Sequence, residues 1–582
     1  MKILGLNIFH ADTSACLIVD GKIIAASEEE RFARVKHYSG FPVNSIHHAL
    51  KEGDLDINDI DIISINSNPY YNFFHKIKYL FNTFGNIVNL PKRILRVRSK
   101  IELDKNLYNY FGTTKKFKKV YVPHHNAHIY SSFLCSGFNH GLGLSFDASG
   151  DFSTTEVYKI HDNKFKTIKK QIFPHSLGIF YQAITQFLGF NDYGDEYKVM
   201  GLAGFGNNTF KDQFDKIIYF DSNDLFKLNL KYFRHHIIGF DFNFQNNIPF
   251  FENLYSDNIK EILGKPRKKN EEIKQQHYDI AYSLQKKFEE ISSKIISHYK
   301  EDKDKNLFLS GGCAFNAVNN KSLSEKHKFD NIIIQPNSGD AGGALGSALY
   351  ASKKYDKKFI NQNLSSIYMG PKETDEEIYE KIKKYIDKEF VVTNFKKEEE
   401  ENLLSLISNC LYDGKIIAWH QDRMEFGPRA LGNRSILANP LIGSIKDEIN
   451  KKIKTRETFR PFAPSVMRDE VNTYFNINNS MNYNFMNVTC ETKKEYVDKI
   501  QSVLNADGTA RIQIVDITLN RKYYKLLEQF KKLSGYGLLL NTSLNIQEPI
   551  CCNSEDTIKS FLKSDIDVLC IENYVIQRIY EN

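Results

Sequence analysis

The chain has 582 residues, of which 41% are hydrophobic and 26% are charged, and its formal net charge is +7. This balance is typical of a globular protein and excludes a disordered chain, and so small a charge does not call for a nucleic-acid partner. Eight cysteines without a CxxC pair exclude a disulfide framework and a zinc ribbon, and the lack of an apolar run of about 20 residues excludes a membrane span. These features predict a cytoplasmic protein with two large domains.

Two similar strand–turn–strand segments are predicted more than a hundred residues apart. In the first, an apolar strand over residues 1–8 leads into a polar turn at 10–14, followed by strands at 15–19 and 22–26. In the second, a strand over 141–146 leads into an acidic turn at 147–151 and a strand over 154–160. Such hairpins can present backbone N–H groups and an aspartate to a nucleotide and its metal. The recurrence marks either a duplicated domain whose halves face each other or two unrelated hairpins.

Glycines follow two later strands directly. A strand over 306–310 precedes Gly311 and Gly312, and a strand over 332–335 precedes a small-residue run at 336–346. Glycine lets a ligand approach the backbone closely, and the start of the next helix favours anions, so these units predict a nucleotide cleft. Helices are expected over 42–52 and 276–299. The periodicity then fades toward Gly370-Pro371, which predicts a domain boundary between residues 1–370 and 371–582.

Four side chains in the first domain are metal-ligand candidates. His124 and His128 are four residues apart, which places both imidazoles on one face of a helix, although such a pair is often incidental. Asp147 and Asp340 each follow a strand of the predicted cleft, and a set of two histidines and two aspartates suits iron, manganese or zinc. His10, in the first turn, is a candidate general base or only a turn residue.

Lys198, in the first domain, is expected to meet a phosphate or to pair with Glu196.

The second domain holds the densest basic clusters. In the second domain the basic residues alternate with Gly, Pro and Phe, which indicates shaped loops and favours a phosphorylated substrate over a salt-bridge network. These loops contain Arg423, Arg429, Arg434, Lys454, Arg456 and Arg460, and Arg511, Ser543 and Asn545 supply further hydrogen-bonding groups.

A set of motifs spread from Gly5 to Asn545 resembles a known family, the O-carbamoyltransferases of nodulation-factor and antibiotic biosynthesis. The strings that carry the resemblance, in chain order, are GLNIFHADTSACLIVDGKIIAASEEERF, HHNAHIYSSF, FDASGD, YKVMGLAGFG, LSGGCAFN, PNSGDAGGALG, MEFGPRALGNRS, KTRETFRPFAPS, DGTARIQ and LNTSLN. MEFGPRALGNRS is long and highly specific.

The resemblance implies an α/β protein with two domains. The N-terminal domain is expected to be a duplicated actin/sugar-kinase-like (ASKHA) domain, and the C-terminal domain is expected to be YrdC-like. In that family the C-terminal domain makes carbamoyl-adenylate from carbamoyl phosphate and ATP, which binds with Mg²⁺. The N-terminal domain, with Fe²⁺ or another divalent metal, then transfers the carbamoyl group to a hydroxyl of a small-molecule acceptor. A homodimer is compatible with the family.

The resemblance also implies roles for single residues. His124, His128, Asp147 and Asp340 match the family's iron site, and Gly311, Gly312 and Asn316 match its adenine-nucleotide loop. His10 matches the histidine placed near the acceptor, and His10 and Asp12, in the same turn, are counted among the catalytic residues. Lys454, Arg456 and Arg460 fall where carbamoyl phosphate is held, and Arg460 is counted among the catalytic residues. Arg423, Arg429, Arg511, Ser543 and Asn545 fall in the ATP and carbamoyl pocket, and Lys198 is also assigned to substrate binding.

Other classes of protein share parts of this pattern. A tRNA threonylcarbamoyl transferase fusion would be expected to carry a more basic surface than +7, and a hydrogenase-cofactor maturation protein usually carries zinc-finger cysteine pairs. A sugar or acetate kinase of the same superfamily does not need a second domain rich in phosphate-binding arginines. A nucleotide-dependent scaffold needs neither the metal ligands nor the arginine clusters.

Overall fold

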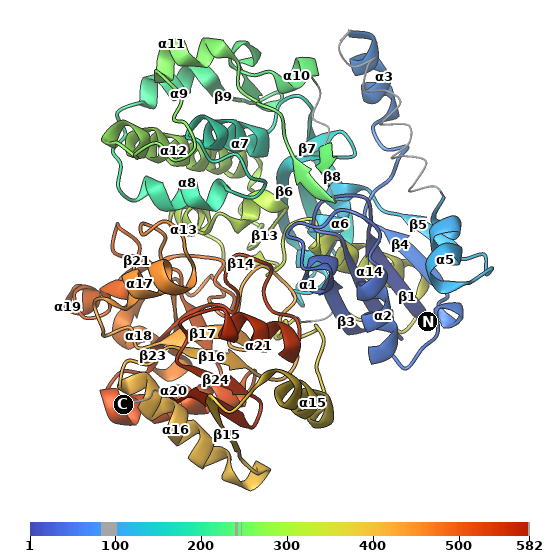
Figure 1. Ribbon diagram of the computed structural model, residues 1–582. Helices are drawn as coiled ribbons and strands as arrows, with labels where there is room; N and C mark the ends of the chain where they lie inside the picture. The colour runs from blue at the N-terminus through green and yellow to red at the C-terminus, as the bar shows by residue number, and fades with distance from the viewer. Residues whose placement is uncertain (83–101, 239–242, 246, 362, 580–582) are drawn as a thin grey trace. The chain divides into compact units, whose positions relative to one another are not determined.

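The computed structural model describes residues 1–82, 102–238, 243–245, 247–361 and 363–579, and the chain separates into two compact units, Met1–Leu364 and Ser365–Asn582 (Figure 1). The boundary expected from the sequence, at residue 370, lies a few residues further along. Each unit combines helices with sheets, which confirms the α/β class. Within the described residues, no helix is both long enough and apolar enough to cross a membrane.

The first unit contains two five-stranded sheets. The first sheet has the order β3-β2-β1-β4-β5, with β1 Lys2–Asn7, β2 Ser14–Val19, β3 Lys22–Glu28, β4 Ile62–Ile65 and β5 Lys118–Tyr121. The second has the order β8-β7-β6-β13-β14, with β6 Gly141–Gly150, β7 Ser153–His161, β8 Lys164–Ile172, β13 Asn306–Ser310 and β14 Asn331–Ile334.

The two sheets repeat one topology. In each, the first three strands form an antiparallel meander, and the last two strands run parallel to the first. The central strands β1, β4 and β13 are almost wholly buried, as expected of parallel strands covered on both faces. The repeat of strand order and direction confirms the duplicated domain.

One helix in each half follows the last parallel strand, and these two helices pack against each other. They are α6 (His124–Phe133) and α14 (Gly342–Tyr355), which lie beside each other in Figure 1. A Cβ atom on Gly346 of α14 would lie 1.8 Å from the carbonyl oxygen of Ala127 in α6, so only glycine permits this approach.

The remaining helices of the first unit surround this centre. The 25-residue helix α12 packs against α7, α8, α9 and α13 (Figure 1). The bounds are α1 Glu29–Ala33, α2 Val43–Glu52, α3 Phe73–Asn82, α5 Leu103–Phe111, α7 Leu177–Phe187, α8 Glu196–Ala203, α9 Lys211–Ile217, α10 His235–Ile238, α11 Lys260–Leu263, α12 Gln275–Tyr299 and α13 Ala317–Lys326. Short strand pairs are β9 Ile218–Asp221 with β10 Leu225–Leu228, and β11 Asn243–Gln245 with β12 Ile248–Phe250.

The second unit is built on an eight-stranded mixed sheet of order β15-β25-β24-β16-β17-β23-β18-β22. The strands are β15 Phe390–Asn394, β16 Ile417–His420, β17 Arg434–Ala438, β18 Ala463–Met467, β22 Gln513–Val515, β23 Leu538–Ser543, β24 Val568–Ile571 and β25 Tyr574–Arg578. A small sheet joins β19 Phe475–Asn476, β20 Cys490–Thr492 and β21 Thr509–Ala510.

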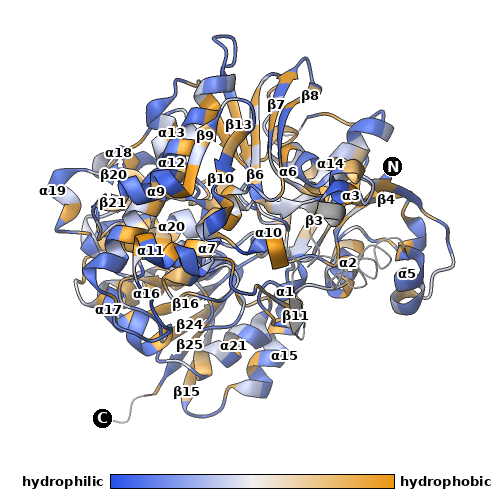
Figure 2. Cartoon of the chain, turned by 90° about the horizontal axis from the view of Figure 1, so that it is seen from above, coloured by the Kyte–Doolittle hydropathy of each residue, from blue (hydrophilic) through white to orange (hydrophobic). Residues whose placement is uncertain are grey.

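Two helices cover this sheet and form the core of the unit with it. Helices α16 (Glu400–Tyr412) and α20 (Arg521–Ser534) pack together over the fully buried Trp419. Figure 2 shows apolar residues along the strands and hydrophilic residues over the outer loops and helices. The other helices are α15 Asp375–Tyr385, α17 Ile445–Glu448, α18 Val471–Tyr474, α19 Lys494–Val497 and α21 Ser554–Leu562.

Candidate active site

The predicted histidine pair lies on one face of α6. His124 and His128 are 3% and 0% exposed, and their Nε2 atoms are 2.9 Å apart. Residues four apart on a helix lie one above the other, which explains why HHNAH aims two imidazoles at one point. The intervening His125 points elsewhere, with its Nδ1 2.8 Å from the hydroxyl of Ser145, so it has a packing role.

Two aspartates from the other half of the unit meet this pair. Asp147 Oδ2, on β6, lies 3.1 Å from His128 Nε2 and 3.8 Å from His124 Nε2. Asp340 Oδ1, just before α14, lies 3.3 Å and 3.5 Å from the same two nitrogens. One donor atom from each of the four side chains lies within 4.8 Å of all the others. The structure therefore brings together all four predicted metal ligands.

The chemistry of this cluster fits a divalent cation. Donor atoms that share an ion at about 2.1 Å are separated by about 3–3.5 Å, which matches most of the distances above. The buried Asp340 Oδ1 makes no hydrogen bond within the described part of the chain, as expected of an oxygen that faces a cation. Burial alone would lower the pKa of His124, but the carboxylates of Asp147 and Asp340 outweigh it and raise the pKa to about 10. Two buried carboxylates thus favour a positive charge here.

His10 lies against this cluster. Its Nδ1 is 2.7 Å from Oδ2 of Asp340, and its side chain is 16% exposed. Asp12 has a left-handed backbone, with φ of 56°, and its Oδ1 is 2.7 Å from Nδ1 of His37. Asp340 therefore contacts His10 with one oxygen and the histidine pair with the other, while Asp12 pairs with His37 instead.

The glycine pair after β13 contacts the cluster from another side. Gly311 has φ of 89°, and a Cβ atom there would lie 2.2 Å from the carbonyl oxygen of Phe146. The N–H of Gly312 donates to Asp147 Oδ2 at 3.1 Å, which joins the predicted nucleotide loop to the predicted metal ligands. Asn316 caps α13 through Asn319 N–H and exchanges hydrogen bonds with the amide of Gln285.

Lys198 pairs with Asp195. Its Nζ lies 2.7 Å from Asp195 Oδ1, and both side chains are mostly buried. Asp195 and Lys198 belong to one charged cluster in the sequence, and their spacing of three residues is the signal of this pair. Glu196 is partly buried, and its desolvation raises the pKa of its carboxyl group to about 7.

In the second unit, Lys454 is held by the loop that follows β23. Its Nζ donates to the backbone carbonyls of Ser543 and Asn545 and to Asn545 Oδ1, the last at 2.7 Å. The side chain is 3% exposed. The structure therefore brings Lys454, from the KTRETFRPFAPS motif, together with Ser543 and Asn545, from the LNTSLN motif.

Three predicted arginines share one neighbourhood. Burial, together with the positive charges of Arg429 and Arg456, holds the pKa of Arg511 well below its usual range. Arg456 donates from Nε to Asn450 Oδ1 at 2.7 Å, and its guanidinium lies over the ring of Phe462 at 4.7 Å. Mutually repelling guanidinium groups that are partly buried are typical of a site that an anion neutralises.

Arg460 is held through its backbone by Asn450, which also contacts Arg456. Its carbonyl accepts a hydrogen bond from Asn450 Nδ2 at 3.3 Å, so it is fixed by the residue that also holds Arg456. Its guanidinium Nη1 lies 3.6 Å from Glu457 Oε2, a long contact for an ion pair.

Two other arginines of the basic clusters bind backbone carbonyls. Arg423 donates to the carbonyls of Met369 at 2.7 Å and Gly370 at 3.1 Å. Arg434 is fully buried, and it donates to the carbonyls of Gln421, Asp422, Asn433 and Cys552. Arg434 lies in the sequence among the phosphate-binding candidates, but its hydrogen bonds to backbone carbonyls give it a structural role.

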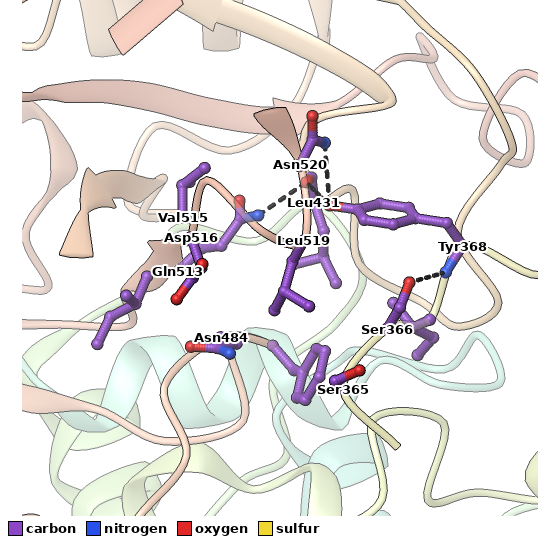
Figure 3. A pocket seen from close by; sticks show the side chains of 13 residues that line it. Ser365, Ser366, Tyr368, Leu431, Asn484, Gln513, Val515, Asp516, Leu519 and Asn520 are labelled. Carbon is purple, nitrogen blue, oxygen red and sulfur yellow. Dashed lines mark hydrogen bonds between the residues drawn. The ribbon is translucent and has the colours of Figure 1, made fainter. Parts of the chain in front are cut away.

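A small cavity in the second unit lies beside the MEFGPRALGNRS motif. Its volume is about 20 Å³, which is room for roughly one water molecule (Figure 3). The hydroxyl of Tyr368 and the amide of Gln513 both donate to the carbonyl of Leu431 at 2.7 Å, and Asn520 donates to Tyr368. None of the predicted site residues lines this cavity. Its polar groups support the loop that carries Arg429.

Comparisons with known proteins identify the family. The family model described as "Carbamoyltransferase N-terminus" matches residues 2–349, and the family model described as "Carbamoyltransferase C-terminus" matches residues 408–578. The chain therefore belongs to the carbamoyltransferase family, which confirms the resemblance found in the sequence.

Several relatives are similar to this chain. Nodulation protein NolNO of Sinorhizobium fredii is 32% identical over 98% of this chain and 80% of its own length. An uncharacterised protein of Synechocystis is also 32% identical, over 99% of this chain and 96% of its own length. The 3'-hydroxymethylcephem-O-carbamoyltransferase of Streptomyces clavuligerus is 30% identical over 41% of this chain and 42% of its own length.

Proposed function

We propose that this carbamoyltransferase is an O-carbamoyltransferase that works in two steps. The second unit forms carbamoyl-adenylate from carbamoyl phosphate and ATP, and the first unit transfers the carbamoyl group to an acceptor hydroxyl. The observation that carries the first step is the group of arginines around the partly buried Arg511, because guanidinium groups that repel one another are typical of a site that anionic substrates neutralise.

The activating step needs positive charge at fixed positions. Water cleaves carbamoyl phosphate into carbamate and inorganic phosphate, and a carbamate oxygen then bonds to the α-phosphorus of ATP as pyrophosphate leaves. Charge develops on the departing phosphate and pyrophosphate, and Arg429, Arg456, Arg460 and Arg511 are the groups that would neutralise it. Mg²⁺ is expected with ATP. Lys454 is positioned with Ser543 and Asn545, where it would orient the carbamoyl group.

The transfer step needs a base beside the carbamoyl carbon. The acceptor oxygen bonds to that carbon, AMP leaves with the bonding electrons, and the hydroxyl proton passes to His10, whose orientation Asp340 fixes. Fe²⁺ or another divalent metal held by His124, His128, Asp147 and Asp340 would supply a Lewis acid that polarises the carbamoyl carbonyl. The glycine loop at 311–312 would hold the adenylate.

The acceptor class is proposed from the relatives. One relative is named for a hydroxymethyl group on a cephem, and another is a nodulation protein. A hydroxyl on a sugar, a nucleotide sugar or a natural-product small molecule is therefore the proposed acceptor.

Pyrophosphate release tests the activating step without an acceptor. The purified protein is incubated with Mg²⁺, ATP and carbamoyl phosphate, and we expect pyrophosphate together with the mass of carbamoyl-adenylate. Arg511→Gln removes the positive charge at the centre of the arginine group, and the rate of release should fall about 100-fold or more, the usual effect of losing one such donor. Arg468→Gln is the matched control, because that arginine is about half exposed and pairs with Asp516.

Release of pyrophosphate that depends on carbamoyl phosphate, and that only Arg511→Gln abolishes, supports the proposal. A folded protein that releases no pyrophosphate would contradict the adenylate mechanism. Equal loss in both variants would mean that Arg511 has no special part in it.

A further inference from the structure

Asp151 is the first residue of the turn between β6 and β7, a few residues beyond Asp147. Its carboxylate accepts three hydrogen bonds from two other segments of the chain. Oδ1 accepts from the hydroxyl of Ser67 at 2.7 Å, and Oδ2 accepts from the backbone N–H groups of Asn68 and His124, both at 2.8 Å. The carboxylate therefore joins the segment after β4 to the start of α6.

This contact satisfies a need of α6 that its own sequence leaves open. The first N–H groups of a helix have no acceptor within the helix, and the residue before α6 is Pro123, which has no side-chain group to accept a hydrogen bond. Asp151 supplies that acceptor from a distant part of the sequence. Its negative charge also lies at the positive end of the helix, where a carboxylate is stabilising.

The same hairpin fixes the ring of His124. A Cβ atom on Gly150 would lie 2.0 Å from Cδ2 of that imidazole, so the glycine backbone packs directly against it. Gly150 therefore limits the position of the ring while Asp151 holds the backbone of the same residue. Because His128 lies one turn further along α6, its position depends on the same helix start.

The duplicated fold explains why a hairpin reaches this helix. In the other half, the segment after β1 contacts the start of α14, where His10 lies 2.7 Å from Asp340 and the hydroxyl of Ser14 donates to the carbonyl of Ala341 at 2.8 Å. Each hairpin thus crosses to the helix that follows the last parallel strand of the opposite half. On the side of α6, Asp151 makes the contact between hairpin and helix that His10 and Ser14 make on the side of α14.

We propose that Asp151 is a positioning residue of the metal cluster. It does not contact the ion. It holds the first turn of α6 so that the Nε2 atoms of His124 and His128 face Asp147 and Asp340. The inference rests on the proposed metal binding of these four residues, and it assigns a role to a fifth residue outside them.

The test is Asp151→Asn, with Co²⁺ as the probe. Asparagine keeps the shape, but an N–H group replaces one oxygen, so the side chain can no longer accept all three hydrogen bonds. We expect the Kd for Co²⁺ to rise at least tenfold, the usual effect of losing an outer partner of a metal ligand, and the visible absorption of bound Co²⁺ to shift. Circular dichroism should stay that of a folded protein.

Asp162→Asn is the matched control. Asp162 also has a left-handed backbone, with φ of 49°, in the neighbouring turn between β7 and β8, but its side chain is 76% exposed. We expect this variant to bind Co²⁺ as the parent does. His124→Ala, which removes a ligand, sets the upper limit of the loss.

The outcomes separate this inference from the proposed function. Parental Co²⁺ affinity and absorption in Asp151→Asn, with binding lost in His124→Ala, would overturn the role of Asp151 and leave the metal cluster standing. A parent protein that binds no Co²⁺ would overturn both. If Asp151→Asn does not fold, Ser67→Ala decides, because it removes only the bond to Oδ1. Weaker Co²⁺ binding in Ser67→Ala supports the role of Asp151, and unchanged binding overturns it.

Discussion

The charge of His37 depends on two carboxylates beside it. Asp12 Oδ1 lies 2.7 Å from the imidazole, and Glu30 accepts from the backbone N–H of His37 at 2.7 Å. Burial alone would lower the pKa of His37, but Asp12 and then Glu30 outweigh it and raise the pKa to about 9. His37 is therefore expected to be protonated at neutral pH, beside Asp12 in the turn that also carries His10.

This raised pKa predicts how stability changes with pH. A histidine titrates near 6.5 when unfolded, so its extra stabilisation is complete below that pH and is lost as the pH rises through about 9. Asp12→Asn should lower the pKa of His37 and remove this dependence. The melting temperature, measured between pH 6 and 10, should fall more steeply in the parent than in the variant between about pH 7 and 9. Parallel curves would contradict the assignment.

Metal removal should destabilise the parent and leave a ligand variant unaffected. A ligand that binds only the folded state, at about 1,000 times its Kd, stabilises by about 4 kcal/mol, so a chelator should lower the melting temperature of the parent. In His128→Gln the chelator should have little effect, because one ligand is missing. His161→Gln, whose side chain is 76% exposed, should behave as the parent. Equal responses of His128→Gln and the parent would exclude His128 as a ligand.

The sequence alone predicted the residues whose spacing carries a signal. His124 and His128 follow helical spacing, and Asp147 and Asp340 each follow a predicted strand, so their meeting at one point was expected and is observed. The partners of Lys454 and the contacts of Arg434 and Asp151 were not predictable. They depend on which segments fold against each other, and nothing local distinguishes a buried arginine that binds carbonyls from one that binds phosphate.

At the scale of elements, strands and turns were predicted closely because apolar runs between polar turns define them. The strands expected over 22–26 and 306–310 are observed at Lys22–Glu28 and Asn306–Ser310, and the helix expected over 276–299 is α12, Gln275–Tyr299. The pairing of strands across more than a hundred residues needed the structure. Only the repeated strand order distinguishes a duplicated domain from two unrelated hairpins.

The packing of α6 on α14 gives a prediction at this scale. Gly346→Ala would place a methyl group 1.8 Å from the carbonyl oxygen of Ala127, so the two helices must separate. Overpacking of this kind costs about 1–3 kcal/mol of unfolding free energy, and it should also weaken Co²⁺ binding because α6 carries two ligands. Gly443→Ala, where a Cβ atom meets nothing within 4 Å, is the control. Unchanged stability and Co²⁺ affinity in Gly346→Ala would show that the helices tolerate the shift.

At the scale of the whole molecule, the two kinds of site lie in different compact units. The metal cluster lies within Met1–Leu364, and the arginines lie within Ser365–Asn582. The family matches also fall into an N-terminal and a C-terminal model. Each unit has a hydrophobic core of its own, so a substitution in one site need not disturb the fold of the other.

This separation predicts that variants fall into two classes. Arg460→Ala should reduce pyrophosphate release from ATP and carbamoyl phosphate about 100-fold and leave the Kd for Co²⁺ within twofold of the parent. His128→Gln should show the reverse, with Co²⁺ binding lost and pyrophosphate release retained, because the proposed activating step takes place in the second unit. In the double variant the two effects should add, since sites without shared partners are independent. Loss of pyrophosphate release in His128→Gln would mean that the metal cluster takes part in activation, and the assignment of one step to each unit would then be wrong.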